Sequence, residues 1–95
     1  MIRSFQGQLA QDLFFDRSTS LTRRFPHELR AIAQRKLQAI NAAHELRDLS
    51  VPPGNKLKPL KGELKGMHSI RINDQWRIVF VWDRGAHHVR VIDYH

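Results

Sequence analysis

Residues 68–82 read HSIRINDQWRIVFVW, and apolar side chains occupy every second position on both sides of the Asn73-Asp74 pair. This alternation, rich in β-branched and aromatic residues, predicts two strands joined by a short turn. A second turn is expected over residues 83–86 and a third strand over residues 88–92. The sequence therefore predicts an antiparallel meander in this part of the chain.

The same alternation sorts the side chains onto the two faces of the sheet. Ile70, Ile78 and Phe80 fall on one face, which we expect the helices to cover. Arg71 and Arg77 then meet on the uncovered face of neighbouring strands, where they repel each other unless an anion joins them. Guanidinium groups match the geometry of a phosphate, so a phosphate is the natural candidate.

Two helices are expected before this sheet. Apolar residues at helical spacing predict the first over about residues 7–16. Pro26 and Glu28 are typical of a first helical turn, where a missing amide costs nothing and an acid suits the helix dipole. Apolar residues then recur at helical spacing as far as Ile40, and the pattern ends near Glu45. The second helix is thus predicted from about Pro26 to about Glu45.

The remaining segments connect these elements. Residues 2–5 are a short apolar stretch that fits an edge strand, residues 18–20 are polar and loop-like, and residues 51–55, VPPGN, must end any helix. No repeat or long linker divides the chain, and 95 residues suffice for one core. We therefore expect a single α+β domain over residues 1–95, with two N-terminal helices packed on a small antiparallel sheet.

The composition excludes several kinds of site. With no cysteine there is no disulfide, no thiolate nucleophile and no cysteine zinc site. The six histidines form no metal-binding motif, and no glycine-rich phosphate loop is present, so we predict neither a metal nor a cofactor. No apolar run is long enough to cross a membrane, and residues 1–5 do not resemble a signal peptide. A cytoplasmic protein without a membrane partner is therefore expected.

The chain is strongly basic, with sixteen Lys and Arg against nine Asp and Glu and a net charge of +7. A cluster of these cations lies between residues 56 and 71, where Glu63 is the single acid. The cluster consists of Lys56, Lys58, Lys61, Lys65 and Arg71. Such a surplus attracts polyanions, nucleic acid above all. A solvated face or a docking surface for an acidic protein would produce the same composition.

These residue types suit cleavage of RNA without a metal. The 2′-hydroxyl of the substrate is the nucleophile, so the protein needs only groups that transfer protons and cations that stabilise the transition state at phosphorus. The chain ends in Asp93-Tyr94-His95, which supplies a carboxylate, a phenol and an imidazole. The candidate cations are Lys61, Arg71 and Arg77. A frayed polar tail and solvated lysines would show the same pattern.

Five segments, taken together in their order and spacing, point to one family. They are MIRSF (1–5), LKPLKGELKG (57–66), SIRIN (69–73), WRIVF (76–80) and VIDYH (91–95). With these segments the chain resembles the HigB toxins, the plasmid-maintenance killer branch of the RelE superfamily. The resemblance implies a RelE-like, microbial-ribonuclease-like fold and an endoribonuclease that cuts mRNA in the A site of the 70S ribosome. It also implies a HigA-like helix-turn-helix antitoxin. The toxin would then reach operator DNA only through this antitoxin.

Residues of the family's active-site pattern can be carried over by position. They are Lys61, Arg71, Arg77, Asp93, Tyr94 and His95. One position departs, because the family commonly has a histidine where this chain has Lys58. A lysine stabilises negative charge, but it is a poor base unless its pKa is strongly lowered. More of the proton transfer then falls on Asp93 and His95.

The sequence thus predicts an RNA-cleaving site on the uncovered sheet face. The predicted catalytic residues are Lys61, Arg77, Asp93, Tyr94 and His95, and the predicted RNA-binding residues are Lys56, Lys58, Lys65 and Arg71. The other cations, interpreted as ribosomal RNA contacts or as aids to solubility, include Arg23, Arg24, Arg30, Arg35, Lys36 and Arg90. Two alternatives remain open. One is a non-catalytic toxin of the same superfamily that binds a protein target such as DNA gyrase, and the other is a non-catalytic RNA- or DNA-binding module.

Overall fold

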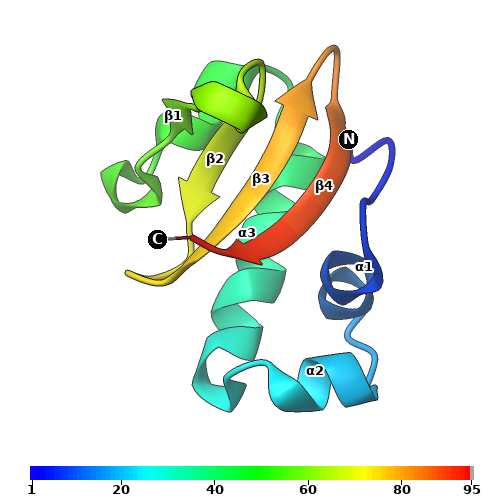
Figure 1. The fold of residues 1–95 in the computed structure, drawn as a ribbon. Coiled ribbons are helices and arrows are strands. Elements are labelled where there is room, and N and C mark those ends of the chain that lie inside the picture. The colour runs from blue at the N-terminus through cyan, green and yellow to red at the C-terminus, as the bar shows by residue number, and fades with distance from the viewer. Residues whose placement is uncertain (95) are drawn as a thin grey trace.

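The structure, a computed structural model, describes residues 1–94 (Figure 1). Its α-helices are α1 (Gln8–Phe14), α2 (Ser20–Arg24) and α3 (Arg30–Ala42). Its 3-10 turns are η1 (His27–Leu29), η2 (Leu46–Ser50), η3 (Pro53–Asn55) and η4 (Gly62–Leu64). Its strands are β1 (Lys58–Pro59), β2 (His68–Arg71), β3 (Trp76–Trp82) and β4 (Ala86–Asp93). All three α-helices therefore precede the strands, as expected for an α+β domain.

The strands form one antiparallel sheet in the order β1-β2-β3-β4. Ile78 of β3 is paired with Ile70 of β2 and with Val91 of β4. The predicted meander is confirmed, and its third predicted strand is longer than expected, because β4 begins at Ala86 and ends at Asp93.

The N-terminal segment lies beside β4. Ile2 forms an isolated parallel bridge with Ala86, and Phe5 forms another with Val89. Residues 2–5 thus occupy the edge position that the sequence predicted, as two separate bridges and without a continuous strand. The pairing covers the outer side of β4, so this strand is not an open edge of the sheet along its first half.

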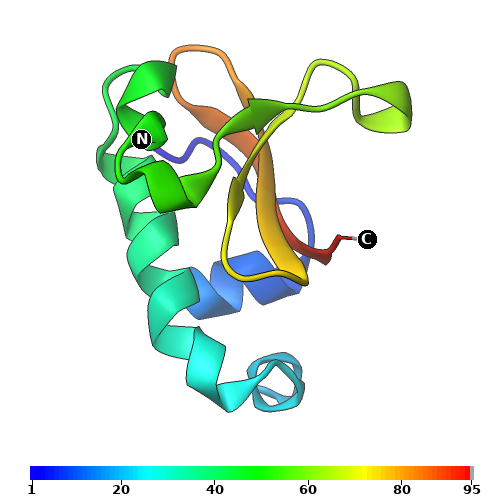
Figure 2. The same ribbon diagram turned by 90° about the vertical axis from the view of Figure 1, so that its left-hand side faces the viewer.

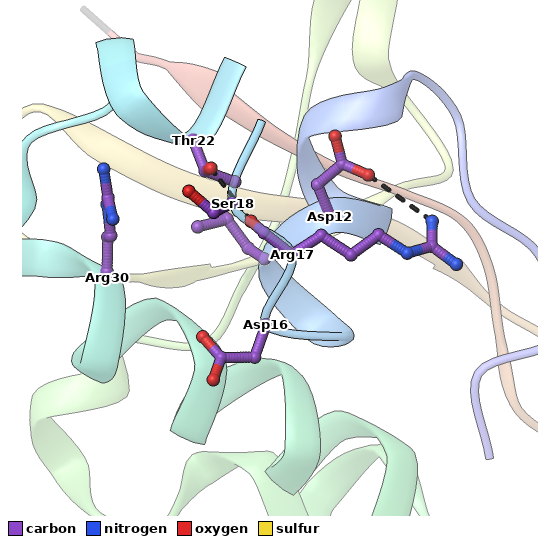
Figure 3. A pocket seen from close by; sticks show the side chains of 7 residues that line it. Asp12, Asp16, Arg17, Ser18, Thr22 and Arg30 are labelled. Carbon is purple, nitrogen blue, oxygen red and sulfur yellow. Dashed lines mark hydrogen bonds and ion pairs between the residues drawn. The ribbon is translucent and has the colours of Figure 1, made fainter. Parts of the chain in front are cut away.

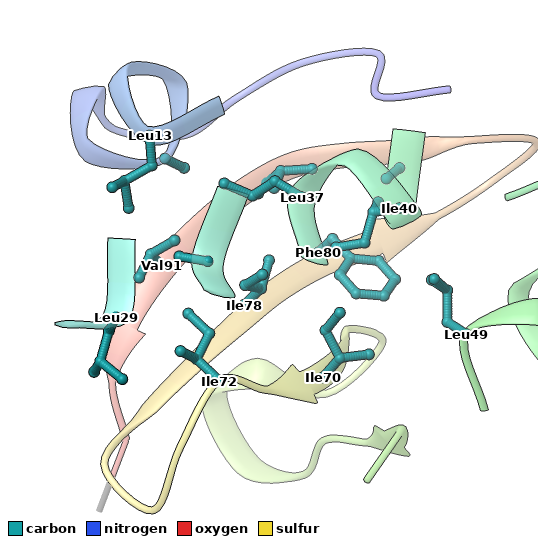
Figure 4. Close-up of a cluster of buried hydrophobic side chains, with 14 of the residues drawn as sticks. Leu13, Leu29, Leu37, Ile40, Leu49, Ile70, Ile72, Ile78, Phe80 and Val91 are labelled. Atoms are coloured by element: carbon teal, nitrogen blue, oxygen red, sulfur yellow. The ribbon is translucent and has the colours of Figure 1, made fainter. Parts of the chain in front are cut away.

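The hydrophobic core lies between α3 and one face of the sheet. Leu37 and Ile40 of α3, and Ile70, Ile78 and Phe80 of the sheet, are all 0% exposed (Figure 4). Burial of each such side chain contributes about 1.5–3 kcal/mol. Figure 2 shows α3 on one side of the sheet and the C-terminal end on the other. The opposite face, on which Arg71 and Arg77 were predicted, is left without a helix.

The prediction of two N-terminal helices differs from the structure, which has three α-helices within residues 1–94. The extra helix, α2, begins where residues 18–20 were interpreted as a loop. Thr19 caps it, because its hydroxyl accepts from the backbone N–H of Thr22 while the Thr22 hydroxyl accepts from that of Thr19. The last helix also ends earlier than predicted, at Ala42, since Ala43 is extended with ψ of 134°.

A buried carboxylate holds the junction of α1 and α2 (Figure 3). Asp12 is 2% exposed and accepts hydrogen bonds from Gln8 at 2.9 Å and from the Thr19 hydroxyl at 2.9 Å. Arg17 forms an ion pair with it at 3.4 Å. These contacts, that of Gln8 foremost, lower the pKa of Asp12 although burial opposes them. The junction therefore favours the ionised carboxylate.

The described helices are short. The longest, α3, has 13 residues. None of the helices found within residues 1–94 is long and apolar enough to pass through a membrane.

Candidate functional site

The uncovered face of the sheet brings two arginines together. Arg71 of β2 and Arg77 of β3 are direct cross-strand partners. Ile70 and Ile78, the adjacent pair, point into the core. Because side chains alternate along a strand, both arginines point away from the helices, as the sequence predicted. Each of the two guanidinium groups is half-buried beside another positive charge.

Two rows of paired residues cross this face. The first row contains Lys58, Ser69, Val79 and Arg90. The second row contains Arg71, Arg77 and Ile92. Cations therefore stand at both ends of the first row and side by side in the second. None of the residues in these two rows is acidic, and Ser69 and Val79 are 0% exposed, so the charged side chains of the two rows are all cations.

Tyr94 follows β4 and lies against two of these cations. The Lys58 ammonium is 5.0 Å from the centre of its ring, and the Arg77 guanidinium carbon is 5.6 Å from it. Such contacts attract a cation to the electron-rich ring face. The backbone N–H of Tyr94 donates to the carbonyl of Gln75 at 2.7 Å, which fixes the residue at the end of the sheet. The ring thereby contacts one cation of the first row and one of the second.

Arg77 is held in position by two acceptors. Its Nη1 donates to the buried Ser69 hydroxyl at 3.0 Å and to the Lys56 carbonyl at 3.4 Å. Burial lowers the pKa of Arg77, Tyr94 raises it and Arg71 lowers it again. A bound anion would relieve both the desolvation and the repulsion from Arg71.

Arg71 already has a carboxylate partner. It forms an ion pair with Asp74, in the turn between β2 and β3. The side chain of Asp74 is 98% exposed, so this pair is screened by water and contributes little to stability. A phosphate between the arginines can therefore compete for Arg71.

Other predicted site residues lie apart from this group. Lys61 and Lys65 are exposed in the loop around η4, which reaches out on the side of the sheet away from α3 (Figure 2). Asp93 is paired with Trp76, whose phase in β3 places it on the face opposite to Arg77, and its carboxylate accepts from Gln75 at 2.9 Å. His95 lies outside the described residues. The structure thus gathers Lys58, Arg71, Arg77, Tyr94 and the backbone of Lys56, whereas Lys61 and Lys65 stand in the η4 loop and Asp93 is in phase with the opposite face.

The sequence reasoning missed two residues of this face. Ser69 holds Arg77, and Arg90 lies in the same row as Ser69 and Lys58. The period-two alternation already puts Ser69 in phase with Arg71, although no role was predicted for it, and the same alternation in the third strand puts Arg90 in phase with Ile92. Arg90 was instead interpreted as a general surface cation.

The arrangement suits chemistry on a phosphodiester. Preorganised guanidinium and ammonium groups stabilise the extra negative charge of the transition state at phosphorus. A phenol beside them is a group that can hold or transfer a proton. Among residues 1–94, no three His, Asp or Glu side chains come together in a way that could hold a metal ion.

Comparison with known proteins gives one consistent result. A family model described as "RelE-like toxin of type II toxin-antitoxin system HigB" matches residues 3–95. Toxin HigB-1 of Vibrio cholerae is 42% identical over 64 residues, which cover 67% of each chain. Endoribonuclease HigB of Proteus vulgaris is 41% identical over 61 residues, 63% of this chain and 65% of that protein.

The fold has a solved counterpart. The YoeB-YefM complex from Staphylococcus aureus contains a chain that matches with a TM-score of 0.61 and 21% identity. The match covers 100% of this chain and 95% of the other. At this identity the likeness shows a shared fold, with the sheet and helices arranged alike.

Proposed function

Because the chain belongs to the RelE-like HigB toxins of type II toxin-antitoxin systems, we propose that it is an endoribonuclease that cuts translated mRNA in the ribosomal A site. The observation that carries this proposal is the pairing of Arg71 with Arg77 on the uncovered face, beside Tyr94 and Lys58. Paired arginines need an anion between them, and the scissile phosphate supplies it. The activity named for the Proteus vulgaris relative is of the same kind.

The reaction we propose uses the substrate's own nucleophile. The 2′-oxygen attacks phosphorus, its proton passes to a base, and the 5′-oxygen leaves after taking up a proton. The products are a 2′,3′-cyclic phosphate and a 5′-hydroxyl, and no metal takes part. Arg71 and Arg77 hold the non-bridging oxygens, while Lys61 reaches the phosphate from the loop around η4. Lys56, Lys58 and Lys65 bind the phosphates on either side.

Proton transfer falls to the C-terminal residues. Tyr94 lies against the cations, so its ring positions Lys58 and Arg77, and its hydroxyl is a further group that can carry a proton. Asp93 or His95 is the proposed base for the 2′-hydroxyl. Asp93 is exposed, but its pairing with Trp76 turns it away from the face of Arg77, so the imidazole of His95 is the first candidate. Lys58, which replaces the usual histidine, stabilises charge and does not act as the base.

The regulation we propose follows from family membership. A helix-turn-helix antitoxin neutralises the toxin and represses the operon, so that the toxin meets operator DNA through the antitoxin alone. The substrate is mRNA on translating ribosomes, and the protein therefore acts in the cytoplasm.

The test is a reconstituted translation reaction with a defined mRNA. Wild-type protein is expected to cut the mRNA only while it is translated and to leave a 2′,3′-cyclic phosphate or 3′-phosphate and a 5′-hydroxyl. A single 2′-deoxy nucleotide at the cut site is expected to abolish that cut, because the nucleophile is missing. Arg77→Gln should cut at least about 100-fold more slowly. The matched control is Arg84→Gln, in the turn between β3 and β4 with a side chain that is 94% exposed, and it should cut normally.

Two results would contradict the proposal. One is intact mRNA in the presence of an active, translating system. The other is growth arrest that survives Arg77→Gln combined with substitution of Asp93, Tyr94 and His95, which would favour a toxin that binds a protein target.

A further inference from the structure

A second cationic site lies on α3, close to the edge of the sheet. The ammonium of Lys36 donates to Asn55 Oδ1 at 2.8 Å. Asn55 is itself 3% exposed, and its Nδ2 donates to the Leu49 carbonyl at 3.1 Å. The amide is therefore locked, and it holds the head of Lys36 in one place.

The segment that holds Lys36 also holds Arg77. Lys56 follows Asn55 directly, and its carbonyl accepts from Arg77 Nη1 at 3.4 Å. Two adjacent residues thus join a cation of α3 to the uncovered face of the sheet. The charge of Arg71 acts on both sites: burial first and then Arg71 and Arg35 lower the pKa of Lys36, and Arg71 is also among the groups that lower the pKa of Arg77.

A surface groove of about 300 Å³ opens beside Lys36. Its lining residues are Ile32, Arg35, Lys36, Ala39, Val51, Pro52 and Asn55. One part of this lining is apolar, including Val51, which is 72% exposed. The other part is formed by two cations and a buried amide. An apolar wall next to cations is the combination that a nucleotide needs, for its base or ribose and for its phosphate.

The charge of Lys36 is not needed for its structural contact. A neutral amide could donate the same hydrogen bond to Asn55 and would avoid the cost of partly burying a cation beside Arg35 and Arg71. No acid is among the groove residues, so the positive charge there is not balanced from within the groove. Such a charge is explained by a ligand that is an anion.

We propose that this groove is a second RNA-binding subsite, which holds a nucleotide of the same strand whose scissile phosphate lies at Arg71 and Arg77. The identity of the ligand rests on the proposed function, since it takes RNA as the substrate. In this arrangement the strand leaves the uncovered face at Arg71, passes the turn at Lys56 and places a further phosphate on Lys36 and Arg35. The RNA strand therefore contacts Lys36 and Arg35 in addition to the cations of the sheet.

Binding of uncleavable RNA tests the subsite apart from cleavage. The probes are 2′-O-methyl oligouridines of two and of six nucleotides, titrated against the purified protein at several salt concentrations. Lys36→Gln removes the charge and retains a donor for Asn55, and Arg35→Gln changes an exposed side chain. Each is expected to weaken binding of the hexanucleotide about three- to tenfold and to reduce its salt slope by about 0.7. Binding of the dinucleotide should weaken less, because its single internucleotide phosphate cannot occupy both sites at once.

Arg84→Gln is the matched control, because it removes the same charge in the exposed turn between β3 and β4. The proposal is overturned if Lys36→Gln and Arg35→Gln bind the hexanucleotide no more weakly than Arg84→Gln does, with unchanged salt slopes. Thermal unfolding of Lys36→Gln checks that the fold is intact, and Arg35→Gln decides the question if it is not. If the wild-type protein does not cut mRNA, the proposed function is refuted. The binding of the hexanucleotide still decides whether the groove is an RNA-binding subsite.

Discussion

Ser69→Ala tests whether the position of Arg77 matters to the chemistry. Ser69 is 0% exposed in β2, and its hydroxyl accepts from Arg77 Nη1 at 3.0 Å. The substitution removes this acceptor and leaves the guanidinium, its charge and the rest of the sheet in place. Arg77 then retains the Lys56 carbonyl at 3.4 Å and the ring of Tyr94 as its neighbours.

The cost to stability should be small and the cost to the rate larger. A hydrogen bond to a charged group contributes about 1.5–3 kcal/mol, but Arg77 is half-exposed and water replaces part of the loss. We therefore expect about 1 kcal/mol of destabilisation, or about 4–8 °C in Tm for a domain of this size. Complete loss of a donor to the transition state costs about 100-fold or more. A guanidinium that is present but loosely held should cost about tenfold.

The assay is single-turnover cutting of mRNA on programmed ribosomes, at saturating protein. Ser69→Ala is expected to lower the cutting rate about tenfold, and Ser69→Thr, which restores the hydroxyl, to recover most of it. In the Arg77→Gln background, Ser69→Ala should have no further effect, because the two residues then act as one unit. Equal effects of Ser69→Ala with and without Arg77 would refute the reasoning, since the serine would not act through the arginine.

Three further predictions concern the core, the α1–α2 junction and Lys58. Phe80→Ala, at a side chain that is 0% exposed, should lower the free energy of unfolding by about 3–5 kcal/mol in urea denaturation. The lowered pKa of Asp12 means that its ionised form stabilises the fold above about pH 4 and that this stability is lost as the pH falls further. In thermal melts, Asp12→Asn should therefore have a lower Tm than the wild type at pH 7, and its Tm should fall less than that of the wild type in acid. Lys58→Gln, which ends the contact with the Tyr94 ring, should weaken RNA binding about three- to fivefold in salt-dependent titrations, while Lys58→Arg should stay near wild type.

The sheet could be predicted because its signal is local. Alternation within residues 68–82 determines which side chains are buried, and the pairing of Ile70 with Ile78 follows from the short turn between them. The two-residue strand β1 has no such signal, since Lys58 and Pro59 become a strand only by pairing with Ser69 and His68. Its existence depends on the tertiary structure, which residue patterns do not contain.

The helical part was less predictable for a related reason. The five residues of α2 are too few to show periodicity, and its cap is a threonine pair that resembles a polar loop. The reciprocal bond between Thr19 and Thr22 is a recognisable start signal, but it depends on two hydroxyls that also suit turns. The end of α3 at Ala42 is set by the turn into η2, which the apolar pattern does not indicate.

The candidate site divides in the same way. Arg71 and Arg77 were placed by alternation alone, which also places Ser69 and Arg90. The contact of Lys58 with Tyr94 joins residues 36 positions apart in the chain, and no local pattern predicts it. Residue patterns also do not predict the link from Lys36 through Asn55 to the sheet, because it depends on how the segment VPPGN folds against α3.

The most direct test of the central claim is a map of mRNA 5′-ends in cells after induction of the toxin. With the wild type and with Arg84→Gln, we expect new ends that lie only in translated regions and follow the reading frame. With Arg77→Gln at equal expression, these ends should fall to background. Identical cuts with Arg77→Gln, or growth arrest by the wild type without new ends, would show that the paired arginines on the uncovered face are not an RNA-cleaving site.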